Sequence, residues 1–164
     1  MPINELLIQE FDREMTNTRR TLERVPEEKW NWKPAEKSGT LGWLAGHVAT
    51  LPGFGTVIVK TPGLEVGGAN FPRVEKHGML IDTFDRAVQD TRKALSGLTD
   101  DQLKENWTLT NQGKTIFTLP RYHALRAMCF NHIIHHRAQL TVYLRLLGVP
   151  VPGLYGPSAD ESVL

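Results

Sequence analysis

The stretch FNHIIHHRAQLTVYL, residues 130–144, holds three of the chain's six histidines within five consecutive positions. Its apolar residues recur at helical spacing, and each residue of a helix advances about 100°, so His132 and His136 lie about 40° apart on one face. Apolar or partly apolar side chains fall in or beside that sector: Leu125, Met128, Cys129 and Tyr143. The pair is therefore expected to point toward the core. An imidazole is costly to bury there without a partner, so we look for a function.

The neighbouring histidines have different expected positions. His135 lies about 60° from His132 and about 100° from His136, so we expect it to rim a site or to face solvent. His123 lies about 180° round from His132 and is expected at the surface.

A third inward histidine stands in LGWLAGHVATL, residues 41–51. His47 lies at the edge of the apolar stripe of that segment, and in a bundle with axes about 8–10 Å apart it can converge with His132 and His136. Three neutral imidazoles at roughly 2.0–2.1 Å from a divalent metal leave a position open for water or substrate, as in catalytic sites. The alternative is that each is a core histidine hydrogen-bonded to a carbonyl, and spacing alone leaves both open.

The rest of the chain predicts a helical bundle. Apolar stripes predict helices over residues 3–24, 40–52 with a continuation over 54–60 after a kink, 82–98, and 120–147. We expect Asp82 to cap the third helix and Thr99 to cap one further short turn. Strand alternation around a glycine-bearing turn predicts a small hairpin over 107–119. We therefore expect one all-α domain, residues 1–164, folded as a four-helix bundle with a small β-hairpin before the last helix.

Two segments are expected to be irregular. Residues 61–79, rich in glycine and proline, predict a loop, and a role as a lid or binding loop is open. The tail VPVPGLYGPSADESVL, residues 149–164, either folds back over the site with Tyr155, Asp160 and Glu161 or packs as a terminus. Arg137 is expected to anchor the tail or a dimer rather than a substrate.

Composition limits the classes of protein that fit. A net charge of +1, with lysines and arginines scattered among acids, gives no electrostatic basis for binding nucleic acid or an anionic membrane. We expect no membrane span, because no apolar run approaches the roughly 20 residues that a span needs, and the acidic N-terminus is unlike a signal peptide. The single cysteine, Cys129, excludes an intrachain disulfide and is more typical of a core residue than of a metal ligand. We expect a cytoplasmic protein.

Short motifs in a fixed order resemble the DinB/YfiT-like metalloenzyme family, which is unrelated to the DNA polymerase that shares its name. In chain order they are WNWKP (30–34), GWLAGH (42–47), HIIHHRAQL (132–140), LRLLG (144–148) and PGLYGPSADE (152–161). The resemblance implies a four-helix bundle, often a homodimer, with a divalent metal on His47, His132 and His136. Zinc or nickel is favoured and iron is an alternative, since three imidazoles do not choose between them. Ala138 is a departure, because the family is expected to carry glycine there.

The resemblance also implies a class of reaction. Its better-understood members transfer low-molecular-weight thiols such as mycothiol or bacillithiol, or use a thiol in an isomerisation, so the expected partner is a small molecule. The metal would act as a Lewis acid on a thiol or on water. Gln139, about 20° from His132 in projection, is a candidate to orient a ligand or to touch substrate.

The same residues leave two other functions open and exclude two kinds of metal site. A metal-dependent hydrolase and a non-catalytic metal-binding or stress-response bundle remain as alternatives. A di-iron centre is excluded because no glutamate is followed by a histidine three residues on. A zinc protease of the HExxH type is excluded because Ile133 stands where its glutamate is needed.

Overall fold

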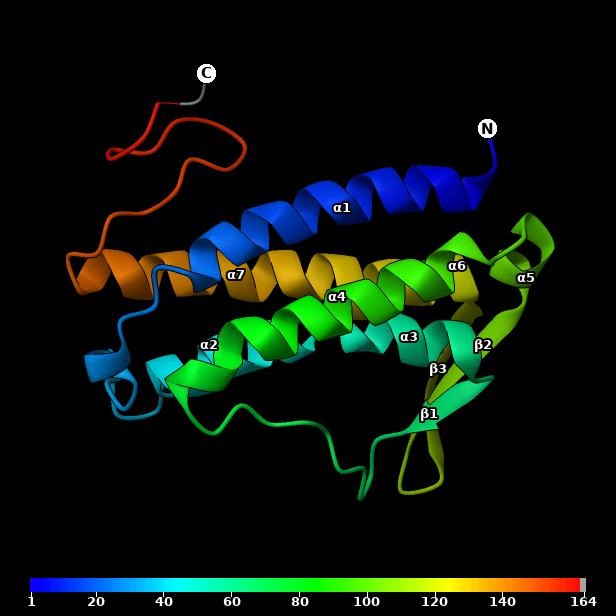
Figure 1. Cartoon of the computed structure of the whole chain (residues 1–164). Coiled ribbons are helices and arrows are strands. Elements are labelled where there is room, and N and C mark those ends of the chain that lie inside the picture. Colours follow the sequence, from blue (N-terminus) through cyan, green and yellow to red (C-terminus); the bar gives the residue numbers. More distant parts are fainter. Residues whose placement is uncertain (163–164) are drawn as a thin grey trace.

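The computed structural model in Figure 1 describes residues 1–162 as a bundle of helices with a small sheet at one end. The bundle consists of α1 (Ile3–Leu22), α2 (Leu41–Thr50) continued by α3 (Gly53–Lys60), α4 (Leu80–Ser96), and a last helical run made of α6 (Arg121–Leu125), the π-helix Arg126–Phe130 and α7 (Asn131–Leu146). Shorter elements are α5 (Asp100–Lys104) and the 3-10 turns Glu27–Lys29 and His77–Met79. The predicted fold class, a helical bundle with a small β element, is confirmed.

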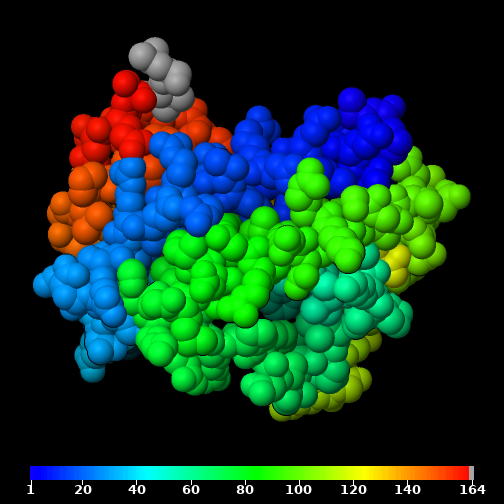
Figure 2. Space-filling model, in the orientation of Figure 1, coloured from blue at the N-terminus to red at the C-terminus, as the bar shows by residue number. Residues whose placement is uncertain are grey.

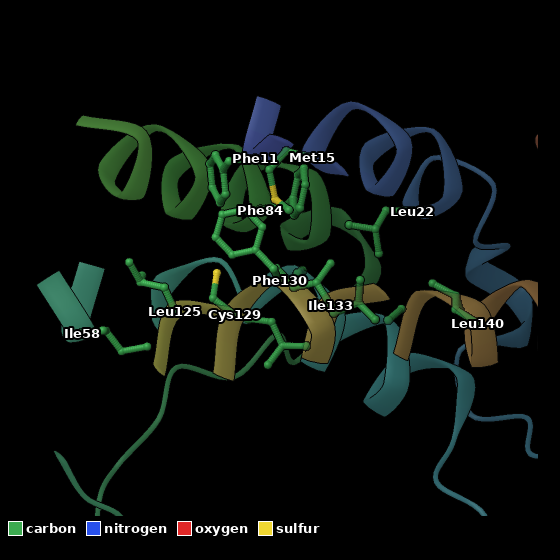
Figure 3. Packing of buried hydrophobic residues seen from close by; sticks show 14 of the residues in the cluster. Phe11, Met15, Leu22, Ile58, Phe84, Leu125, Cys129, Phe130, Ile133 and Leu140 are labelled. Carbon is green, nitrogen blue, oxygen red and sulfur yellow. The ribbon is translucent and has the colours of Figure 1, made fainter. Parts of the chain in front are cut away.

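The helices pack because each buries one apolar face. Phe11 of α1, Phe84 of α4 and Phe130 of the last helical run point toward one another in Figure 3 and are at most 1% exposed. The rings of Phe11 and Phe130 meet edge to face, with their centroids 5.8 Å apart. Burying one such side chain stabilises the fold by about 1.5–3 kcal/mol, so this aromatic layer holds α1 and α4 against the helix that carries two of the candidate ligands.

The second helix bends at Pro52, as predicted. Thr40 caps its start, because its side chain accepts a hydrogen bond from the Trp43 amide at 3.1 Å. The combined span Leu41–Lys60 is long and apolar enough to cross a membrane, so the expectation that no apolar run approaches that length is wrong. The reason is that α3 continues α2 past the bend. However, 56% of its apolar window is buried inside the bundle, which is typical of a core helix of a soluble protein.

The sheet contains one strand more than predicted. Its strands are β1 (Gly63–Glu65), β2 (Asn106–Asn111) and β3 (Lys114–Pro120), in the order β1-β2-β3. The antiparallel β2–β3 hairpin confirms the prediction, whereas β1, parallel to β2, was missed. The carboxylate of Glu65 accepts hydrogen bonds from the amides of Gly67, Gln112 and Gly113, which ties β1 to the hairpin turn.

Of the two helix N-caps predicted from the sequence, one is confirmed and one is wrong. The cap at Thr99 is confirmed: its hydroxyl accepts from the Gln102 amide, and the Gln102 side chain accepts from the Thr99 amide. The cap at Asp82 is wrong, because the 3-10 turn His77–Met79 leads directly into α4 and Met79 is its N-cap. Asp82 lies in the first turn instead, where its charge favours the helix dipole.

The described part of the tail, residues 149–162, packs as a terminus and contributes no residue to the lining of the cavity beside His47. Figure 2 shows it gathered at one end of the molecule, against the C-terminal part of α1. Glu161 pairs with Arg20 and Arg24 of α1, and Asp160 pairs with Arg145 of α7. The predicted domain, residues 1–164, stays a prediction, and its last two positions lie outside the described residues.

Candidate metal centre

Three histidines from two helices converge on one side of the bundle. Nε2 of His47, on α2, lies 3.4 Å from Nε2 of His132, on α7. The ring of His136 has its centroid 4.6 Å from that of His47 and 4.8 Å from that of His132. The candidate ligand atoms of all three lie within 4.8 Å of one another. The structure therefore brings together the three residues that were predicted as ligands, while metal binding itself stays a prediction.

A π-helix precedes the two histidines of α7. This π-helix, Arg126–Phe130, has a wider turn than an α-helix. Residues after it are therefore rotated about the helix axis relative to their positions in a continuous α-helix. Cys129 lies in this turn, fully buried, with Sγ 3.9 Å from the Pro52 carbonyl, and burial raises its pKa to about 12. Cys129 is a core residue, as expected, and does not belong to the ligand group, whereas His132 and His136 are half-buried.

Burial keeps the three imidazoles neutral near pH 7. The pKa of His47 is lowered to about 4, chiefly by desolvation and also by the positive charges that His136 and His132 would carry. Desolvation is also the main cause that lowers the pKa of His132 and of His136. A neutral imidazole is the form that binds a metal, so no proton has to be displaced first.

Hydrogen bonds and stacking orient the rings. Nδ1 of His136 lies 2.7 Å from Oε1 of Gln139, so Nδ1–H donates to the amide oxygen and Nε2 is left free. This contact places Gln139 where it would orient a candidate ligand, and that role stays a prediction. The ring of Trp43 stacks on His47, with centroids 5.4 Å apart and planes 11° apart. Trp43 was not predicted as a site residue, although it stands four residues before His47 and hence on the same helical face.

The donor set fits a divalent metal. Two nitrogens at about 2.1 Å from a tetrahedral ion are roughly 3.4 Å apart, which matches the 3.4 Å between Nε2 of His47 and Nε2 of His132. The candidate ligand atoms of all three histidines lie within 4.8 Å of one another, a spread that is wider than in a bound tetrahedral site. All-imidazole sites suit zinc, nickel, copper or iron. The residues present are therefore compatible with the metal that the sequence analysis expected.

A cavity of about 440 Å³ lies beside the cluster, and His47 is the one histidine of the three among its lining residues. His47 forms part of its wall, and its other polar and aromatic lining residues include Trp43, Thr50, Phe54, Phe71 and Arg73. Two of these, Phe71 and Arg73, belong to the irregular segment 61–79, which therefore contributes to the wall. No periodicity in that segment could have indicated which of its side chains face the cavity.

Other predicted positions are settled by burial and contacts. His123 and His135 are exposed, as expected, and the ring of His135 lies 4.8 Å from that of His136 at the rim of the cluster. Arg137 donates to the Tyr155 hydroxyl at 2.8 Å, which confirms that it anchors the tail. Ala138 is exposed, so the alanine that replaces the expected glycine does not disturb helix packing.

Comparisons with known proteins find one family model, a sequence relative and similar solved structures. The model of the DinB family matches residues 1–163. The chain is 26% identical over 156 residues to YrdA of Bacillus subtilis (strain 168), covering 94% of this chain and 89% of that protein. The crystal structure of a DinB-like protein from Bacillus cereus matches with a TM-score of 0.70 at 26% identity, over 94% of this chain and 98% of the other. The DinB-like protein YjoA of Bacillus subtilis has the same fold, with a TM-score of 0.70 at 20% identity over 91% and 96% of the two chains.

Proposed function

The chain belongs to the DinB family, and from that premise we propose that it is a metal-dependent enzyme that holds a divalent cation with His47, His132 and His136. The reaction we favour is transfer of a low-molecular-weight thiol to a small-molecule acceptor. The observation that carries this proposal is the convergence of three neutral imidazoles, one of which, His47, lines an open cavity. A structural metal site is usually closed by four protein ligands, whereas this group offers three and borders the cavity through His47.

The residues around the cluster prepare it for this role. A divalent cation bound there supplies Lewis acidity, which lowers the pKa of a thiol or of water. Partial burial keeps His47 neutral, Gln139 fixes the ring of His136 through Nδ1, and Trp43 restricts rotation of His47 by stacking. All three histidines are half-buried, and the cavity that His47 lines leaves this residue accessible to substrate.

Thiol transfer is favoured over hydrolysis by what surrounds the cluster. A metal-dependent hydrolase commonly uses a carboxylate as general base. Among the residues that the structure describes, the ligand group contains no acid, and no acid lines the cavity. The lack of a carboxylate ligand also favours zinc or nickel over iron, which is often bound by two histidines and one carboxylate.

Cobalt substitution tests the reaction class. Cobalt-loaded protein is titrated with dithiothreitol, cysteine and bacillithiol, beside matched thioethers that lack the S–H group. If thiols are substrates that reach the cluster, each thiol shifts the visible spectrum, whereas the thioethers leave it unchanged. An unchanged spectrum across all thiols would contradict the transferase and favour the hydrolase or the non-catalytic bundle.

We also propose that the protein acts in the cytoplasm as a homodimer. Val142 and Leu146 lie one turn apart on α7 and are 58% and 61% exposed, which gives an apolar face that a second copy would cover. Light scattering should give twice the chain mass of 18.5 kDa, and Leu146→Glu should return it to the monomer value. A monomer at micromolar concentration in the wild type would contradict this.

A further inference from the structure

The cavity beside the histidines indicates which kind of molecule the protein takes. Its volume of about 440 Å³ falls in the range of about 300–1,000 Å³ that small-molecule sites occupy. We propose that it binds a planar apolar group that carries an anionic group, with the plane on Phe54 and Phe71 and the anion on Arg73. The inference rests on the proposed function only in placing the reacting end of this molecule at the histidine cluster.

Aromatic side chains form a continuous apolar wall. The ring of Phe71 stacks on that of Phe54, with centroids 5.4 Å apart and planes 30° apart. The ring of Phe54 in turn lies 6.4 Å from that of His132, so the wall leads from the loop to the cluster. Across the cavity, Trp43 is 58% exposed, and Phe71 is 38% exposed. Such large exposed rings around a cavity are typical of sites that bind planar ligands.

Arg73 gives the cavity a positive charge that no neighbour compensates. It is the one lysine or arginine in the lining, and no aspartate or glutamate lines the cavity. Within residues 1–162, most arginines pair with an acid: Arg19, Arg20, Arg24, Arg92, Arg121, Arg126, Arg137 and Arg145. Arg73 has no such pair among the described contacts. A free guanidinium at the edge of an aromatic cavity is suited to a carboxylate, which it can bind through two parallel hydrogen bonds.

The loop that carries Phe71 and Arg73 is held in place. The buried side chain of Val74 packs against α2 so closely that a Cβ at Gly46 would lie 3.1 Å from the Cβ of Val74. Further along, Nε2 of His77 lies 2.8 Å from the Val25 carbonyl. The wall therefore exists before ligand binding, so the entropic cost of ordering this loop when a ligand binds is smaller.

Calorimetric titration of metal-free protein with three probes tests the inference. The probes are 2-naphthoate, which has both features, 2-naphthamide, which has the ring system without the charge, and acetate, which has the charge without the rings. We expect naphthoate to bind about tenfold more tightly than naphthamide, because a carboxylate–guanidinium contact is charge-assisted. Acetate should not bind measurably.

Two variants test which residue contacts the anionic group of the probe and which contacts its rings. Arg73→Gln should reduce the preference for naphthoate over naphthamide to less than about twofold, and Phe71→Ala should weaken both naphthyl probes by a similar factor. The matched control is Arg13→Gln, because Arg13 is exposed on α1 and does not line the cavity. Both loop residues are exposed, and circular dichroism checks that each variant is folded.

The outcomes separate this inference from the proposed function. An equal affinity for naphthoate and naphthamide, or a preference that survives in Arg73→Gln, would overturn the inference. Because the titration uses metal-free protein, binding that depends on Arg73 supports the cavity assignment even if the histidines bind no metal. Naphthoate binding that appears only after zinc loading would mean that the cluster, rather than Arg73, takes the anion, and would also overturn it.

Discussion

The guanidinium of Arg137 lies 2.7 Å from the carboxylate of Glu14, and the two side chains are 1% and 4% exposed. Arg137 directly follows the candidate ligand His136, so this buried pair fixes the ligand-bearing helix against α1. The Tyr155 hydroxyl donates to the same carboxylate at 2.6 Å and accepts from Arg137 at 2.8 Å. One network therefore joins α1, α7 and the tail on a face of α7 different from that of the histidines.

Breaking this pair is expected to destabilise the protein strongly. Arg137→Met leaves the buried carboxylate of Glu14 without its cation, so the free energy of unfolding in urea should fall by about 3–5 kcal/mol. Arg145→Met is the matched control, since its ion pair with Asp160 is exposed to solvent and its loss should change the free energy of unfolding far less. Equal losses in the two variants would show that the buried network has no special role.

Gln139 is expected to tune metal affinity. Gln139→Ala removes the acceptor that holds Nδ1–H of His136, so affinity for zinc in a competition titration should fall roughly 10- to 100-fold. Gln89→Ala, at an exposed position of α4, is the control and should leave the affinity unchanged. An unchanged affinity in Gln139→Ala would mean that the contact does not orient the ligand.

The lowered pKa of His47 predicts an acid-sensitive fold in the metal-free protein. Its value of about 4 in the folded state compares with about 6.5 in an unfolded chain. Between these values the unfolded state binds more protons, so stability falls as pH drops through this window and is unaffected by this group above about pH 7. After allowance for partial exposure, the loss is on the order of 1 kcal/mol.

Comparison with His47→Gln isolates this contribution. Urea unfolding at pH 7.5, 6.0 and 4.5 includes the titration of carboxylates in both proteins, so the informative quantity is the difference between them. The wild type should lose more stability than the variant as pH falls. A difference that is constant across the three pH values would contradict the assigned cause.

Two glycines of α3 are expected to differ in how an alanine substitution changes stability, because only Gly55 lies against α4. A Cβ at Gly55 would lie 2.3 Å from Cγ2 of Thr91, so Gly55→Ala should destabilise by about 1–3 kcal/mol through overpacking. Gly53→Ala, with nothing within 4 Å of its Cβ, should be neutral or stabilising by up to about 1 kcal/mol. Adding Thr91→Ser to Gly55→Ala removes the clashing methyl and should restore part of the loss in thermal unfolding; no restoration would argue for another cause.

The predictable part of the molecule is the part with helical periodicity. The 3.6-residue period was enough to bring His47 and His132 onto facing helices, because their positions depend on two regular segments. The π-helix before α7 has no sequence signature of that kind, and β1, with only the residues Gly63–Glu65, is too short to show alternation. Phe71 and Arg73 were missed because their positions depend on contacts of an irregular loop with α2.

Metal content tests the central claim most directly. Tag-free protein that has never been exposed to a nickel column is analysed by mass spectrometry, with His136→Ala beside it and His123→Ala, an exposed histidine of α6, as the control. The account predicts about one divalent metal per chain in the wild type and the control, and its loss in His136→Ala. No metal in the wild type, even after refolding with zinc, nickel or iron, would contradict it and would leave the three histidines as residues of a binding module.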